Sequence, residues 1–316
     1  MVSSVKSPHL SIKVTVEPLT EDAFRPFGTV IANPVPHTAA NSHARSPSQS
    51  VATMGVSPTT TSARAVSANQ GTALKYVDVT DVKNLYERAP SRKRARVAMT
   101  MFVCSPREMK PSSPTSRDSV SDGGGLFPIK ILERHPFTTQ TFIPLGLSPL
   151  DSDTKYLVIV APTLPPPPRT REKWPPPYPA PPPRRRRSLT EIFSRARPSP
   201  FPEEPRRSSL VSTKPSDSKE RLPGPGPPDL THIKAFLADG SQAVTYGAGT
   251  WHAPMVVLGK NAIDFVVVQY VNGVSQEDCQ EVEITSEGMG EGIVAVVPAL
   301  STQPSEAPTL RVASKL

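Results

Sequence analysis

Short runs in which apolar and polar residues alternate recur along the chain. Residues 10–16 place an apolar side chain at every second position, which is the pattern of a strand with one buried face. Residues 96–104 repeat this pattern, and the apolar residues expected on one face there are Val97, Met99, Met101 and Val103. Residues 156–161 are apolar almost throughout, which predicts a strand buried on both faces.

Further strand-like runs occur at 233–237, 242–246, 255–258 and 263–271, and turns that contain glycine separate them. Short strands joined in this way at regular spacing are typical of a β-barrel or a β-sandwich. A short helix is expected after Thr20, whose hydroxyl can cap it, and Pro26 should end it. The sequence therefore predicts an all-β fold with a few short helices.

Three stretches interrupt the strand pattern, at 33–70, 106–122 and 163–228. They are rich in small polar residues or proline, so they cannot bury enough apolar surface to offset the entropy lost on ordering. We therefore expect them to be disordered inserts within a single domain that spans 10–284. Residues 285–316 are expected to form a flexible tail.

The insert at 163–228 holds 20 of the 40 prolines and carries 14 Lys/Arg against 6 Asp/Glu. The rest of the chain balances at 22 basic and 22 acidic residues, so the net charge of +8 belongs to this insert. A nucleic-acid-binding domain should carry basic charge on its own folded face, which argues against that function. Such a tract is typical of a solvated polyproline loop, although residues 175–178 also fit the ligand of WW-type domains.

The ends of the chain and its cysteines indicate a compartment. Cys104 and Cys279 are too few for a disulfide framework, so a reducing compartment is expected. No run of 18 apolar residues and no signal-peptide core occurs, so neither a membrane span nor secretion is expected. The chain ends in Ser314, Lys315 and Leu316, the tripeptide that the peroxisomal import receptor reads. This predicts a peroxisomal protein; the alternative is a chance tripeptide on a cytoplasmic protein.

Two segments gather histidine, aromatic and polar residues: ERHPFTTQTFIPLG at 133–146 and PDLTHIKAFLADGSQAVTYGAGTWHAPMVVLG at 228–259. Together with KYLVIVA at 155–161 and DFVVVQY at 264–270, they resemble the ureidoglycolate lyase family, also called ureidoglycolate hydrolase. The resemblance covers about half of the chain and implies a cupin-like β-barrel, often a homodimer. It also implies that the insert at 163–228 leaves and re-enters the barrel at neighbouring points. The implied reaction splits ureidoglycolate into glyoxylate and urea in allantoin and purine degradation.

A metal-binding cluster is one interpretation of the two segments. Glu133 and His135 are two residues apart, so both side chains point to the same side of a strand. Gln140 follows five residues after His135, and His252 supplies a distant histidine of the kind that a cupin uses. Imidazole and carboxylate ligands suit nickel, manganese or zinc, whereas a glutamine amide is a weaker ligand. The alternative is a metal-free polar pocket in which these residues bind the substrate and one another.

The implied reaction needs a base and an acid. Ureidoglycolate is a hemiaminal, so its cleavage removes a proton from the carbinol hydroxyl and delivers one to the departing urea nitrogen. Histidine titrates in the required range, which points to His252 as the base and to His135 as a metal ligand or an acid. No water is consumed, so the protein is expected to be a carbon–nitrogen lyase and not a hydrolase.

Candidate substrate contacts flank these residues, and they are Arg134, Lys234, Gln242, Tyr246, Trp251 and Asp264. Arg134 and Lys234 can offer positive charge to the substrate carboxylate, although Arg134 alternates away from its two neighbours and can face out of the barrel. Gln242 and Tyr246 share a strand face. Trp251 can wall the pocket or pack in the core, and Asp264 can orient a histidine or cap a turn.

Other functions remain open at this point. The chain could be a cupin-like binding protein without turnover, a scaffold that acts through its proline-rich insert, or an enzyme for another ureido acid or 2-hydroxy acid. Release of glyoxylate would separate an enzyme from a binding protein. The sequence contains no nucleophile elbow, phosphate-binding loop or Rossmann fingerprint, so no nucleotide cofactor is expected.

Overall fold

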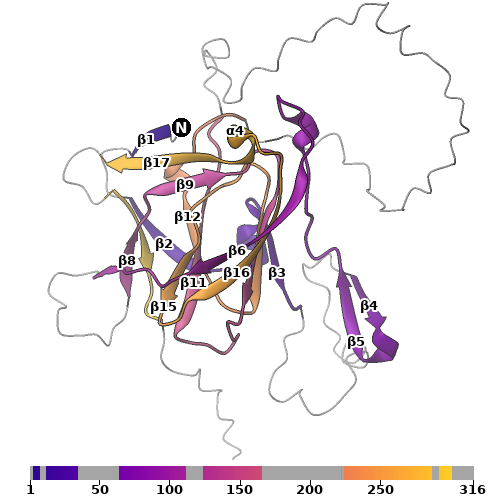
Figure 1. Cartoon of the computed structure of the whole chain (residues 1–316). Helices are drawn as coiled ribbons and strands as arrows, with labels where there is room; N and C mark the ends of the chain where they lie inside the picture. The colour runs from indigo at the N-terminus through magenta and orange to yellow at the C-terminus, as the bar shows by residue number, and fades with distance from the viewer. Residues whose placement is uncertain are drawn as a thin grey trace, which may run out of the picture.

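The computed structural model describes residues 3–7, 12–34, 64–111, 124–165, 222, 224–286 and 292–300. These residues form two curled β-sheets and a separate two-stranded hairpin, with short helices at the margins of the sheets (Figure 1). The all-β prediction is therefore confirmed. None of the helices in the described residues is long and apolar enough to span a membrane.

The larger sheet curls around its own hydrophobic core. Its strands are β1 (Ser3–Ser7), β2 (Ile12–Pro18), β7 (Lys110–Pro111), β8 (Gly125–Pro128), β9 (Ile131–Arg134), β11 (Thr154–Ala161), β12 (Lys234–Ala238), β14 (Trp251–His252), β15 (Val256–Gly259), β17 (Gln280–Ser286) and β18 (Ile293–Val297). They are ordered β1-β17-β9-β14-β11-β12-β2-β18-β8-β7, and β15 also pairs with β11.

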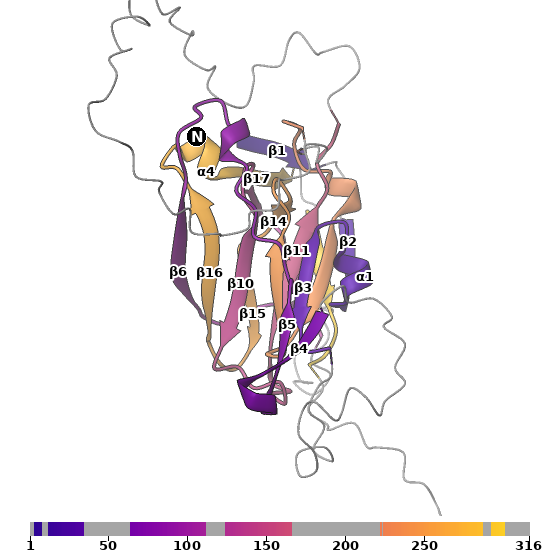
Figure 2. The same ribbon diagram turned by 90° about the vertical axis from the view of Figure 1, so that its right-hand side faces the viewer.

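The smaller sheet packs against the other side of β11. Its order is β3 (Gly28–Ala32), β13 (Gln242–Tyr246), β10 (Gln140–Leu145), β16 (Ile263–Val271) and β6 (Arg96–Cys104). Figure 2 shows β6 at the outer margin of this sheet, with β16 and β10 beside it. A second core fills the space between the two sheets and contains aromatic rings such as Phe142 and Phe265.

Strand β11 is the central element, as its apolar run predicts. Leu157 and Ile159 point into the core inside the larger sheet, whereas Val158 and Val160 point toward the smaller sheet. Every residue from Tyr156 to Ala161 is buried. A strand covered on both faces needs apolar residues at successive positions, which is why its sequence does not alternate.

Short helices close the margins of the sheets. They are α1 (Glu21–Phe24), α4 (Ser275–Asp278), and the single turns η2 (Asn69–Gly71), η3 (Tyr86–Arg88) and η4 (Leu230–His232). Thr20 caps α1 as predicted, because its hydroxyl accepts a hydrogen bond from the Ala23 amide at 3.3 Å. The short α1 thus starts where a side chain can satisfy one of its free amides.

The prediction that 33–70 is a disordered insert is wrong for the last residues of this stretch. Strands β4 (Arg64–Ala68) and β5 (Ala73–Val77) pair antiparallel and form a hairpin that projects from the domain (Figure 1). The turn between them has Gln70 at a positive φ of 57° and Gly71 at 88°. The small residues of β4 gave too weak an apolar pattern to show this strand in the sequence, and 35–63 lie outside the described residues.

The structure also describes residues at the start of the insert at 106–122 and at both ends of the insert at 163–228. Lys110–Pro111 pairs with β8, so the expectation of disorder from 106 is wrong at that end, and 112–123 lie outside the described residues. Thr163 forms a bridge with Pro228, and the Leu164 amide donates to the Pro227 carbonyl at 2.9 Å. The prediction that the chain leaves and re-enters the barrel at neighbouring points is therefore confirmed.

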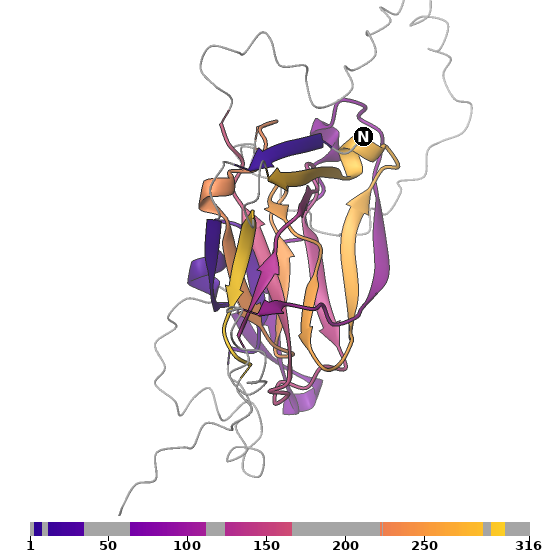
Figure 3. The same cartoon turned by 90° about the vertical axis from the view of Figure 1, so that its left-hand side faces the viewer.

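The expected tail at 285–316 contains a core strand. β18 pairs parallel with β2 and antiparallel with β8, and Ile293, Ala295 and Val297 are buried in the core of the larger sheet. Figure 3 shows β18, in yellow, beside β2, in indigo. The prediction is wrong here because an apolar strand near the end of the chain can be buried in the core as fully as a strand in the middle of the chain. Residues 301–316, with Ser314, Lys315 and Leu316, lie outside the described residues.

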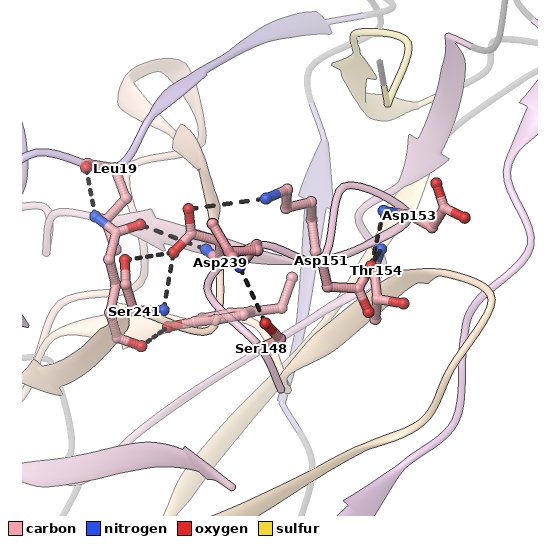
Figure 4. Close-up of polar contacts among 11 residues, drawn as sticks. Leu19, Ser148, Asp151, Asp153, Thr154, Asp239 and Ser241 are labelled. Carbon is pink, nitrogen blue, oxygen red and sulfur yellow. Dashed lines mark hydrogen bonds and ion pairs between the residues drawn. The ribbon is translucent and has the colours of Figure 1, made fainter. Parts of the chain in front are cut away.

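The turn after β12 leads from one sheet into the other. Asp239 accepts hydrogen bonds from the Ser241 amide and hydroxyl at 2.9 Å and 2.6 Å, which fixes the turn (Figure 4). The Lys155 ammonium lies 3.7 Å from the same carboxylate. β12 belongs to the larger sheet and β13 to the smaller one, so this turn is where the chain crosses the second core.

Candidate active site

A glycine turn brings the two histidine-containing segments together. The Gly249 amide donates to the His135 carbonyl at 2.8 Å, and Gly249 has a positive φ of 78°, which glycine adopts without strain. The chain then enters β14, where His252 lies directly opposite Glu133 of β9. Four of the predicted residues therefore meet at one end of the barrel, and they are Glu133, His135, Gln140 and His252.

His252 is buried and held by three oxygen atoms. Its Nδ1 lies 3.0 Å from the Thr250 carbonyl, and its Nε2 lies 3.0 Å from Gln140 Oε1 and 3.5 Å from Glu133 Oε1. Its ring stacks on Tyr246 with 4.0 Å between centroids and an interplanar angle of 10°. Both ring nitrogens therefore lie within hydrogen-bond distance of an oxygen atom.

The ring of His135 has a hydrogen-bond partner at only one of its nitrogens among the described residues. Its Nδ1 donates to the Asp278 carbonyl at 2.6 Å, which leaves the lone pair on Nε2. Nε2 is buried and has no hydrogen-bond partner among the described residues. Burial, reinforced by the charge of His252, lowers the pKa of His135 to about 4. The ring is therefore neutral at physiological pH and presents an unprotonated nitrogen to the cluster.

Glu133 supplies the negative charge of the cluster. Burial raises the pKa of its carboxyl, but the hydrogen bond from His252 and the electrostatic attraction of that ring outweigh burial and leave the pKa below its ordinary value. The carboxylate is thus ionised beside His252. Because the group is partly shielded from water, its attraction to a neighbouring cation is stronger than at the surface.

The donor atoms fit a divalent metal ion. One ligand atom from each of Glu133, His135 and His252 lies within 4.8 Å of the other two. Two imidazoles and one carboxylate are a ligand set used by catalytic zinc and other transition metals, which keep a further position for water or substrate. The unpartnered, unprotonated Nε2 of His135 is the observation that favours this fit. Gln140 instead bonds His252 and donates to Gln269 at 2.9 Å.

Arg134 points away from the cluster into a buried niche. Its guanidinium carbon lies 4.4 Å from the Trp251 ring centroid, and its nitrogens donate to Gln280 Oε1 at 2.8 Å and 2.9 Å. A third bond reaches the carbonyl of Gly224, at the end of the longest insert, at 3.0 Å. These contacts give both Arg134 and Trp251 packing roles, and they tie the insert boundary to β9.

We expect Arg134→Met to destabilise the protein by about 2–4 kcal/mol, because the buried Gln280 oxygen would lose both of its donors and the Gly224 carbonyl would lose one. Urea unfolding followed by circular dichroism measures the change. Arg107→Met is the matched control, since Arg107 is exposed and also lies over an aromatic ring, 5.7 Å from the Phe127 centroid. Equal effects of the two substitutions would contradict the buried role.

Three predicted substrate contacts lie outside the cluster. Lys234 is exposed and pairs with Glu17 at 3.2 Å. Gln242 donates to the Leu19 carbonyl at 2.9 Å, at the turn drawn in Figure 4. Asp264 is exposed on β16, opposite Val103 of β6. No contact between these three side chains and the cluster occurs among the described residues, so their roles toward substrate stay predictions.

The structure brings Gln269 and Cys279 into contact with the cluster, although the sequence assigned neither of them a role. Gln269 of β16 lies opposite Gln140 and accepts its amide hydrogen bond. The Cys279 sulfur lies 4.0 Å from Glu133 Oε2, and burial, followed by the charge of Glu133, raises the pKa of this thiol to about 12. The pairing of β10 with β16 carries the first contact, and no local signal in the sequence gives that register.

A polar network fixes the backbone that holds His135. The Asp278 carboxylate accepts hydrogen bonds from the Tyr86 hydroxyl at 2.7 Å, the Asn272 amide at 2.8 Å and the Gly273 amide at 2.7 Å. The carbonyl of the same residue binds His135 Nδ1. The network therefore sets the orientation of the imidazole and the nitrogen that carries its proton.

Sequence comparison relates this chain to a protein family. The sequence pattern of the ureidoglycolate lyase family matches residues 11–290. The chain is 28% identical over 268 residues to ureidoglycolate lyase of Schizosaccharomyces pombe, covering 85% of this chain and 90% of the relative. It is 27% identical over 290 residues to that of Saccharomyces cerevisiae, covering 90% and 99%. A Burkholderia mallei ureidoglycolate lyase is 22% identical over 255 residues, 81% of each chain. The chain therefore belongs to the ureidoglycolate lyase family.

Proposed function

We propose that the protein is a ureidoglycolate lyase that splits ureidoglycolate into glyoxylate and urea, a step of allantoin breakdown in purine catabolism. The observation that carries this proposal is the convergence of Glu133, His135 and His252 within 4.8 Å in a chain of this family. The three curated relatives compared above are all named ureidoglycolate lyase.

The chemistry needs one proton to leave an oxygen and one to reach a nitrogen. Removal of the carbinol proton lets the oxygen form a carbonyl with the same carbon, and the carbon–nitrogen bond breaks. The bonding electrons pass to the urea nitrogen, which takes up a proton. Acid and base are regenerated together, so the cleavage consumes no water.

His252 is the base in this proposal. When its Nε2 takes up the carbinol proton, Gln140 Oε1 at 3.0 Å and the Glu133 carboxylate at 3.5 Å stabilise the resulting cation. The same nitrogen then returns a proton to the departing urea. His135, with its lowered pKa and free Nε2, accepts a hydrogen bond or binds a metal and does not serve as the acid.

Glu133 and His135 would hold a divalent metal ion, with His252 Nε2 as a third ligand when it carries no proton. Such an ion would supply a Lewis acid that polarises the oxygen atoms of the substrate. One nitrogen cannot hold a metal and a proton at once, so the base and ligand roles of His252 exclude each other. Nickel, manganese and zinc all suit this donor set.

Tyr246 completes the cluster on the side of the smaller sheet. Its ring stacks on His252, and its buried hydroxyl has no hydrogen-bond partner among the described residues. A ureido nitrogen or a carboxylate oxygen of the substrate could bond to that hydroxyl. Burial raises its pKa above the ordinary value, so it stays protonated and can donate.

The oligomeric state and the cellular compartment of the protein are two further predictions. The resemblance predicts a homodimer, and the C-terminal tripeptide predicts import into peroxisomes through its receptor. Support for import comes from the sequence of Ser314, Lys315 and Leu316. Expression of the chain with and without this tripeptide, followed by fluorescence microscopy, tests it.

The proposal is tested by glyoxylate release from racemic ureidoglycolate, with the spontaneous rate subtracted. We expect turnover by the purified full chain. Saturable binding of ureidoglycolate without glyoxylate would instead identify a binding protein. Turnover of a related ureido acid or 2-hydroxy acid in preference to ureidoglycolate would identify a different enzyme.

Tyr86→Phe should lower kcat by roughly 10-fold with little change in KM, because it removes the hydroxyl that fixes Asp278 and, through it, His135. Steady-state kinetics of glyoxylate release measures both constants. Tyr76→Phe is the matched control, since Tyr76 lies on the projecting hairpin. A parallel loss in both variants, or a change in KM alone, would count against a positioning role for Tyr86.

A further inference from the structure

Two glutamines stand where the core-facing rows of two neighbouring strands otherwise carry apolar residues. Along β16, Phe265 and Val267 are buried in the second core at every second position, and Gln269 follows them on the same face. Along β10, Phe142 is buried in the same core, and Gln140 precedes it in the same way. Gln140 and Gln269 lie directly opposite each other in the pairing of these strands, which run side by side in Figure 2. A polar side chain at a core-facing position needs hydrogen bonds, so this pair calls for a role.

The two amides form a chain of hydrogen bonds that ends at His252. Gln140 Nε2 donates to Gln269 Oε1 at 2.9 Å, and Gln140 Oε1 lies 3.0 Å from His252 Nε2. The Gln140 side chain is buried, whereas Gln269 is partly exposed. The hydrogen bond from Gln140 is the only one that the Gln269 side chain makes with the described residues, so its link to His252 runs through Gln140.

The direction of this chain decides which atom of Gln140 faces the imidazole. A glutamine amide carries one acceptor oxygen and one donor nitrogen, and a half-turn about its last side-chain bond exchanges their places. With Gln269 Oε1 as the acceptor, the nitrogen is held on the side of β16 and the oxygen on the side of His252. The reversed amide would set an N–H group against His252 Nε2, where it opposes a proton on that nitrogen.

An oxygen at this place assists the proposed reaction when the carbinol proton is transferred. The proton reaches His252 Nε2, and Gln140 Oε1 then accepts a hydrogen bond from the new N–H group. An acceptor that is oriented before the reaction starts stabilises charge as it develops in the transition state, without any rearrangement. Because this interaction strengthens in the transition state and not on substrate binding, its loss should appear in kcat.

We propose that Gln269 is a positioning residue of the lyase site, which fixes the Gln140 amide with its oxygen toward His252. Its effect on turnover rests on the proposed function with His252 as the base. The fixed orientation itself does not, because it follows from the contacts of the two glutamines with each other and with the ring. The hydrogen-bonding character of residue 269 is therefore what matters, and its size is secondary.

Three substitutions of Gln269 separate an acceptor from a donor and from simple packing. Gln269→Met removes the acceptor at similar volume and should lower kcat by roughly 10-fold with little change in KM, as for other residues that orient a catalytic group. Gln269→Glu offers acceptors only, holds the amide in the same orientation and should restore most of that turnover. Gln269→Lys offers donors only, turns the Gln140 oxygen toward itself and should lower kcat further than methionine does. Steady-state kinetics of glyoxylate release measures both constants.

A double-mutant cycle tests whether Gln269 acts through Gln140. Gln140→Met should lower kcat at least as much as Gln269→Met, and the double variant should be no slower than Gln140→Met. Losses that add in the double variant would overturn the proposal, because Gln269 would then act independently of Gln140. The matched control is Gln276→Met, which should leave kcat unchanged, since Gln276 is partly buried in α4 and its side chain has no hydrogen bond to the described residues.

Nuclear magnetic resonance gives a readout that needs no turnover. The side-chain amide resonances of Gln140 are assigned by their loss in Gln140→Met, and the same spectra show whether each variant folds. The proton bonded to Gln269 Oε1 should shift upfield in Gln269→Met and stay downfield in Gln269→Glu. Gln140 amide resonances that do not respond to Gln269→Met would overturn the proposal, whatever the kinetics show. A wild-type chain that releases no glyoxylate would instead overturn the proposed function, and the amide shifts would still decide the orientation of Gln140.

Discussion

His252→Ala should lower glyoxylate release from ureidoglycolate by roughly 100-fold to 10,000-fold, the range by which a positioned acid–base group accelerates a reaction. His252 is buried between Gln140, Glu133 and the Tyr246 ring, which hold its imidazole in place. The loss is expected whether His252 acts as the base or as a metal ligand. It should appear in kcat, since the group is needed in the transition state.

The control for this prediction is His232→Ala. His232 is largely exposed in η4 and pairs with Asp229 at 2.7 Å, so its loss should leave turnover unchanged. His252→Gln keeps a polar side chain of similar volume and guards against a failure to fold, which circular dichroism checks. Full activity in either His252 variant, from folded protein, would remove His252 from the mechanism.

The fold could be predicted from the sequence wherever burial leaves a periodic trace. Residues 12–18 alternate because one face is covered, and residues 156–161 do not alternate because both faces are covered. Strand β4 escaped prediction because most of its residues are small and Val66, its largest apolar side chain, is 42% exposed. β18 escaped because position near the end of a chain says nothing about burial.

The candidate site could be predicted in its residues but less well in their roles. The two-residue spacing placed Glu133 and His135 near each other, and the structure adds His252 at 3.5 Å from Glu133. Spacing cannot show that Arg134 stacks on Trp251 in a buried niche, because that contact depends on strands far apart in the sequence. The tautomer of His135 likewise depends on the Asp278 carbonyl, from a segment 143 residues away.

Glu133→Gln should weaken the binding of a divalent metal by at least about 10-fold, because it removes the anionic oxygen and leaves two neutral imidazoles and a weak amide ligand. Isothermal titration of the chelator-treated protein with Ni²⁺, Mn²⁺ or Zn²⁺ measures the affinity without reference to activity. Glu283→Gln is the matched control, since Glu283 is exposed on β17 opposite Ile131.

The same titrations decide between the two roles of His252. If His252→Gln also weakens metal binding, its Nε2 is a ligand and a different group must take the carbinol proton. If metal binding depends on Glu133 and His135 but not on His252, the ring is free to serve as the base beside an ionised carboxylate. If the wild-type chain binds none of the three ions, the cluster works as a metal-free pocket. In that case the free Nε2 of His135 accepts a hydrogen bond from the substrate.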